Sequence, residues 1–124
     1  MQSEAQSRFL NTVKIAYFDR SEVRRALDEY VRLTTVNHPE VEEVVLFGSV
    51  VAGTPVPGSD VDLLLVLTSS DRPFRDRIPL FLPSGFPVAM DVFPYTRDEI
   101  TRMKDERNSF IQGALREGLT LFKK

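Results

Sequence analysis

Two carboxylates stand two positions apart at the head of an apolar run. Asp60 and Asp62 precede the unbroken apolar stretch Leu63–Leu67. In a strand, residues i and i+2 point to the same face, so the two carboxylates would project side by side. Adjacent carboxylates repel, and one takes up a proton unless a cation lies between them. The pair therefore predicts a Mg²⁺ site, although such a pair taken alone is more often a solvated strand entrance.

A Gly-Ser turn, Gly48-Ser49, closes the preceding apolar segment Val41–Phe47. Free backbone N–H groups at such a turn suit phosphate oxygens, and glycine lets the backbone approach an anion closely. Taken alone, a turn of this kind is usually structural. It is not the longer glycine-rich phosphate loop that ends in Lys-Ser/Thr, because no lysine lies between Lys14 and Lys104.

A third carboxylate, Asp91, lies within the apolar segment Val88–Phe93. A charge inside an apolar strand is costly unless it is paired or binds a metal. Pairing with an arginine, or a place on an edge strand, would explain it equally well. If this strand lies beside the one that carries Asp60 and Asp62, the three carboxylates converge on one metal site facing the Gly-Ser turn.

Helices and strands alternate along the chain, which predicts an α+β (α/β-like) fold with a sheet of at least three strands flanked by helices. The expected strands cover 41–47, 60–67, 86–93 (closed by Pro94) and, more briefly, 119–122, with a weak candidate at 13–17. A helix is expected from the Asp19/Glu22 capping box to Asn37, a short one after 71–73, and a long one over about 97–117 that starts at the Thr96/Glu99 capping box and ends at Gly118.

Length and composition limit the classes of function. At 124 residues the chain predicts one domain spanning 1–124, with a flexible tail at 1–12. The absence of cysteine excludes thiol nucleophiles and zinc-thiolate sites, and the lone His38 disfavours a histidine triad. A net charge of -2 makes nucleic acid an improbable partner. No apolar run has the length of a membrane span and the N-terminus lacks a signal-peptide pattern, so a cytoplasmic location is expected.

Together, Gly48-Ser49, the ten-residue gap, Asp60-Val61-Asp62 and the later Asp91 resemble the nucleotidyltransferase superfamily of DNA polymerase β and the aminoglycoside nucleotidyltransferases. The size is most similar to that of the minimal nucleotidyltransferases. By motif the resemblance covers a core of residues 41–93. It implies the nucleotidyltransferase fold, a mixed sheet in the order 1-2-3 with strands 1 and 2 antiparallel and strand 3 parallel to strand 2.

The resemblance also implies the roles of the site residues. Gly48 and Ser49 would hold the phosphates of a nucleoside triphosphate. Asp60, Asp62 and Asp91 would ligate Mg²⁺, and Asp91 would also help to deprotonate an acceptor hydroxyl. The implied reaction is in-line transfer of a nucleoside monophosphate, AMP from ATP, with two metal ions at the attacking and leaving oxygens.

The sequence departs from the minimal members after the Gly-Ser turn. These often continue with Ala-Arg-Gly-Glu, whereas positions 51–54 here read Val-Ala-Gly-Thr. The missing arginine puts nucleotide affinity or turnover in doubt while the carboxylates remain. Arg72, Arg75 and Arg77 could supply a phosphate contact instead, although arginines of this kind more often form a solvated face.

The core leaves little chain to build a second domain for the acceptor, so the acceptor is expected on a partner. The resemblance suggests a helical HEPN-type toxin that forms a toxin–antitoxin pair with the transferase, which would modify a hydroxyl such as a tyrosine on it. The alternative is a catalytically weak or inactive antitoxin that neutralises a helical partner by contact alone. The partly apolar segment 78–87 is a candidate interface.

Overall fold

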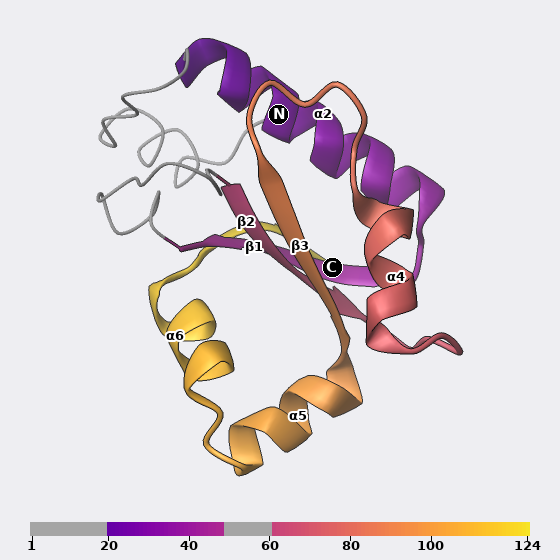
Figure 1. Cartoon of the computed structure of the whole chain (residues 1–124), viewed down its shortest axis with the longest axis vertical. Coiled ribbons are helices and arrows are strands. Elements are labelled where there is room, and N and C mark those ends of the chain that lie inside the picture. The colour runs from indigo at the N-terminus through magenta and orange to yellow at the C-terminus, as the bar shows by residue number, and fades with distance from the viewer. Residues whose placement is uncertain (1–19, 49–60) are drawn as a thin grey trace.

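The computed structural model describes residues 20–48 and 61–124 (Figure 1). Its elements are α2 (Arg20–Asn37), β1 (Val41–Phe47), β2 (Val61–Leu67), α4 (Phe74–Phe81), β3 (Met90–Thr96), α5 (Arg97–Asp105), α6 (Ser109–Glu117) and β4 (Leu119–Lys123). Several predictions fall outside these residues: the tail at 1–12, the strand at 13–17, the cap at Asp19, and everything expected of Ser49, Asp60 and positions 51–54.

The four described strands form one mixed sheet in the order β3-β2-β1-β4. β2 runs antiparallel to β1, and β3 runs parallel to β2. The order and directions of the three core strands are as predicted. β4 adds an antiparallel strand on the far side of β1, where the sequence indicated a last short strand.

Helices cover both faces of this sheet (Figure 1). On one face α2 and α4 pack against the strands through buried residues that include Val23, Leu27 and Phe81. On the other face α5 and α6 pack through Ile100, Ile111 and Ala114. The central strand β2 is covered from both sides, and Leu63–Leu67 are each at most 1% exposed. This explains why its apolar run is continuous rather than alternating.

The sequence predicted a third strand over 86–93 that ends before Pro94. The observed strand starts later, at Met90, and runs through Pro94 to Thr96. Among the strands of residues 20–48 and 61–124, β3 lies at an edge of the sheet and pairs with β2 alone. Proline is tolerated at an edge because no ladder partner needs its missing N–H. The Pro94 carbonyl accepts a hydrogen bond from Arg77 Nη1 at 3.0 Å, so a side chain takes the place of a further strand.

The predicted single helix over 97–117 is in fact two helices, α5 and α6. Arg107 adopts a positive φ of 56°, which interrupts the helical backbone. The Asn108 side chain then caps α6 by accepting a hydrogen bond from the Ile111 N–H at 3.1 Å. The predicted capping box of Thr96 and Glu99 at the start of α5 is confirmed, with both reciprocal hydrogen bonds present.

Gly118 ends α6 as predicted, but not through the left-handed backbone that a glycine commonly supplies at this position. Its φ is -72° and its ψ is 157°. A Cβ atom on Gly118 would overlap the Ala114 carbonyl oxygen and the Val45 side chain. Glycine is needed here because the chain passes too close to α6 and β1 for any side chain.

Candidate active site

Asp62 and Asp91 lie side by side on neighbouring parallel strands. They are register partners between β2 and β3, and adjacent strands are spaced about 4.8 Å apart. Register partners point to the same face of a sheet, so two carboxylates separated by 29 positions in the sequence project together. Asp62 is half-buried and Asp91 is exposed.

Each of the two aspartates is the second residue of its strand, at the end of the sheet where β2 and β3 both begin. Asp62 shares its face with Leu64, and Asp91 shares its face with Phe93, which is the face covered by α5 and α6. The expectation that Asp91 lies in the middle of an apolar strand is therefore wrong. Because it lies near the strand start and is exposed, burial does not require it to have a partner.

Gly48 brings the end of β1 against the Asp62 carboxylate. It follows Phe47, which is the register partner of Asp62, and its φ is +94°. A Cβ atom here would overlap Asp62 Oδ2 and lie 3.2 Å from Asp62 Cγ. Both the backbone conformation and the close approach therefore require glycine. The structure thus places three of the five predicted site residues at one end of the sheet, while Ser49 and Asp60 lie outside the described residues.

The donors at this place fit Mg²⁺. Asp62 and Asp91 offer adjacent carboxylate oxygens, and Mg²⁺ is commonly held by one or two carboxylates, with waters and substrate phosphates completing its coordination. Within residues 20–48 and 61–124, no group of three or more acidic or histidine side chains forms a ready metal cluster. A third ligand would therefore have to come from Asp60, from substrate or from water.

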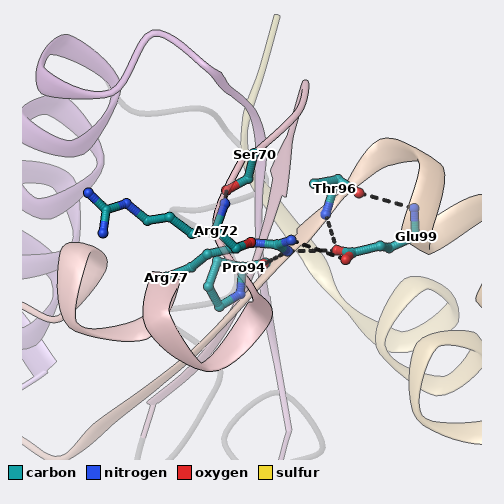
Figure 2. A network of polar contacts seen from close by, with 6 residues as sticks. All are labelled: Ser70, Arg72, Arg77, Pro94, Thr96 and Glu99. Atoms are coloured by element: carbon teal, nitrogen blue, oxygen red, sulfur yellow. Dashed lines mark hydrogen bonds and ion pairs between the residues drawn. The ribbon is translucent and has the colours of Figure 1, made fainter.

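Arg77, which the sequence suggested as either a phosphate contact or part of a solvated face, is neither. It is only 4% exposed. Its Nε donates to the Arg72 carbonyl at 2.9 Å, and Nη1 donates to the Pro94 carbonyl and to Glu99 Oε1 at 3.0 and 2.7 Å (Figure 2). Nη2 donates to Glu99 Oε2 at 3.1 Å. These bonds occupy the guanidinium and tie α4 to β3 and α5, whereas Arg72 and Arg75 are exposed.

Glu99 serves this network and the start of α5 at the same time. The hydrogen bond from Arg77 is the largest cause that holds the pKa of the Glu99 carboxyl below its usual value, and the Thr96 N–H adds to it. The sequence did carry a signal for the buried arginine. Arg77 occupies the helical stripe formed by Phe74, Ile78 and Phe81, where an apolar residue is the ordinary choice.

The other face of the sheet carries a separate cavity of about 370 Å³ between α2 and the segment 80–87. Leu33, Leu80 and Leu82 line it and are 44–45% exposed. We refer to this surface as the apolar groove. It includes part of the segment that the sequence indicated as an interface. Its lining residues pack with the layer of α2 and α4, so the groove is distinct from the carboxylate pair.

The geometry defines an α+β protein with a carboxylate pair at one end of a mixed sheet. Residues 13–117 match the sequence model of the nucleotidyltransferase domain, so the chain belongs to that family. Among solved structures, the chain is similar to a candidate nucleotidyltransferase from Sulfolobus solfataricus, with a TM-score of 0.56 and 22% identity over 98% of this chain and 86% of that one. This likeness supports the fold. A comparison with curated proteins finds no match.

Nucleotidyl transfer is the general activity of the domain to which this chain belongs. In the part of the chain that the structure describes, no helix is both long and apolar enough to cross a membrane.

Proposed function

We propose that the protein is a Mg²⁺-dependent nucleotidyltransferase that transfers AMP from ATP to a hydroxyl group. The observation that carries the proposal is the register pair of Asp62 and Asp91 beside Gly48. The two carboxylates suit a hard cation, and the backbone of Gly48 approaches the carboxylate of Asp62 closely. Asp60 and Ser49 complete the proposed site by sequence.

In the proposed reaction the oxygen of the acceptor hydroxyl forms a bond to the α-phosphorus of ATP. The bond from that phosphorus to the oxygen bridging to the β-phosphate breaks, and pyrophosphate leaves. Asp91 is exposed at the edge strand, where an incoming acceptor could reach it, and is proposed to accept the hydroxyl proton. Mg²⁺ held by the carboxylates would offset negative charge on the phosphate oxygens. Gly48 keeps the space beside Asp62 free of a side chain.

We further propose that the acceptor is presented by a helical partner protein of the HEPN type, as in the pairs formed by minimal nucleotidyltransferases. The elements described here are occupied in forming the sheet and its two covering layers. The acceptor would then be a hydroxyl on the partner, and this chain would act as the antitoxin of a toxin–antitoxin pair in the cytoplasm.

Label transfer tests the enzymatic proposal. The purified protein is incubated with α-labelled ATP, Mg²⁺ and lysate from its native source, and a labelled band identifies the acceptor by mass. Label should require Mg²⁺ and be lost in Asp62→Asn and Asp91→Asn, while Asp105→Asn, an exposed change on α5, should retain it. Label that persists in both site variants would refute the assignment of the site.

The apolar groove favours a second candidate function, in which the protein neutralises its partner by contact alone. Three large aliphatic side chains, Leu33, Leu80 and Leu82, are exposed together in this groove, which is more than scattered exposure requires. In this case Leu80→Glu should abolish neutralisation, whereas the Asp60→Asn/Asp62→Asn double variant should neutralise fully. Thr101→Glu, an exposed change on α5, serves as the control for added charge. If the double variant fails to neutralise while still folded, contact alone is insufficient.

A further inference from the structure

Three phenylalanine rings form a cluster at the same end of the sheet as the carboxylates. The ring centroids of Phe47 and Phe93 are 5.5 Å apart, those of Phe47 and Phe110 are 5.4 Å apart, and those of Phe93 and Phe110 are 5.0 Å apart. The rings come from β1, β3 and the first turn of α6. They meet at tilted or edge-on angles, the geometry that aromatic pairs favour.

The register of the sheet places this cluster against the carboxylate pair. Phe47 is the register partner of Asp62 on β1, and Phe93 follows Asp91 by two residues on β3. All four side chains therefore point to the face covered by α5 and α6. Phe110 contacts both other rings from above this face. An aromatic surface and a cation-binding pair thus lie directly beside each other.

The three rings do not belong to the fully buried part of the core between the sheet and the helices α5 and α6. That part consists of residues that are at most 3% exposed, among them Leu64, Ile111 and Ala114. Phe47, Phe93 and Phe110 are only half-buried where they pack against it, and Phe47 lies opposite Asp62 in the sheet. A ligand that combines an anionic group with a flat ring would cover the exposed part of the rings while its anion meets the cation.

We propose that Phe93 and Phe110 form the stacking surface for the base of the bound nucleotide. The inference rests on the proposed function, because it assigns the base of the same nucleoside triphosphate whose phosphates lie at Asp62 and Asp91. Base–aromatic stacking accepts any base, since every base has a π-face. The cluster therefore supplies affinity for a nucleoside over a bare polyphosphate, without fixing which base is preferred.

The test compares two ligands that share their phosphates and differ in the base. Binding of ATP and of ribose 5′-triphosphate is measured by calorimetry at saturating Mg²⁺, without acceptor. Wild type should bind ATP at least about tenfold more tightly than ribose 5′-triphosphate, the size expected of one stacked base. Phe93→Leu and Phe110→Leu should bring this ratio close to one while binding of ribose 5′-triphosphate is retained.

Phe74→Leu is the matched control. Phe74 is also a half-buried phenylalanine on this edge, but it stacks on Tyr95 at 4.5 Å. Tyr95 lies further along β3 from the carboxylates, and its ring centroid is 6.3 Å from that of Phe110, the longest of these ring contacts. This variant should keep the wild-type ratio. Equal affinity of wild type for the two ligands would overturn the stacking surface and leave the proposed function standing. An unchanged preference for ATP over ribose 5′-triphosphate in both Phe93→Leu and Phe110→Leu would also overturn the stacking surface and leave the proposed function standing.

If folded wild type binds neither triphosphate, the proposed function and the stacking surface fail together, which separates this result from the other two. A substitution that unfolds the chain would remove binding of both ligands and is recognised by circular dichroism. In that event the ratio measured on wild type still decides.

Discussion

Replacing Arg77 by methionine should destabilise the protein strongly, because its guanidinium is buried and donates four hydrogen bonds to neighbouring groups. The change removes hydrogen bonds to the carbonyls of Arg72 and Pro94 and to both oxygens of Glu99. A buried acceptor left without a donor costs about 1–3 kcal/mol, and loss of one partner of a buried ion pair costs about 3–5 kcal/mol. The Glu99 side chain is 28% exposed and keeps the Thr96 N–H, so the lower end, about 3 kcal/mol, is expected.

Urea denaturation followed by circular dichroism measures this loss. With a slope of about 1.5 kcal/mol per molar urea, a loss of about 3 kcal/mol moves the midpoint down by about 2 M. Arg75→Met is the matched control, since it is the same substitution on the same helix at a side chain that is 90% exposed, and it should change stability by less than about 0.5 kcal/mol. Similar midpoints for the two variants would refute the reasoning that the buried network ties α4 to β3 and α5.

Three further outcomes are expected. In a thermal shift assay, Gly48→Ala should abolish any rise in melting temperature caused by Mg²⁺, because the added Cβ would displace the Asp62 carboxylate. Gly85→Ala is the control and should keep that rise, since Gly85 also has a positive φ but has open space around it. The buried Arg77 guanidinium lowers the pKa of the Glu99 carboxyl from 4.5. The ionised Glu99 carboxylate therefore contributes its full stabilisation above pH 4.5, and this stabilisation is lost as the pH falls through the folded-state pKa. In an acid titration, the Glu99→Gln variant should lack this loss of stability. Gly113→Ala within α6 should stabilise by about 0.5–1 kcal/mol, while Gly118→Ala should destabilise by about 1–3 kcal/mol through overlap; equal effects in a denaturation experiment would contradict this.

The parts of the fold that follow from local chemistry were predictable from the sequence. The continuous apolar run of β2 indicated a strand covered on both faces, and all of Leu63–Leu67 are buried. The Thr96/Glu99 pair indicated a capping box, which is present. The three-strand order followed from the resemblance of the Gly48-Ser49 and aspartate motifs to a known superfamily, and it is observed.

The parts that depend on tertiary contacts were not predictable in the same way. Pro94 reads as the end of a strand unless it is known that β3 is an edge strand and that Arg77 meets its carbonyl. Arg107 reads as an ordinary exposed helical residue, and only the cap that Asn108 makes to α6 shows why the backbone turns there. Likewise, no local pattern shows that Asp91 lies at an exposed strand start beside Asp62.

Two arginines are held in ion pairs within the described residues, which bears on how the proposed reaction handles the charge of the phosphates. Arg77 donates hydrogen bonds to Glu99 and to the carbonyls of Arg72 and Pro94. Arg97 pairs with Glu42 and Glu43 at 3.2 and 2.7 Å, which raises its pKa and ties α5 to β1. Position 52, where minimal relatives often carry arginine, is alanine. Since two adjacent carboxylates repel an anionic substrate, the proposed cation would be required for nucleotide binding itself and not only for the chemical step.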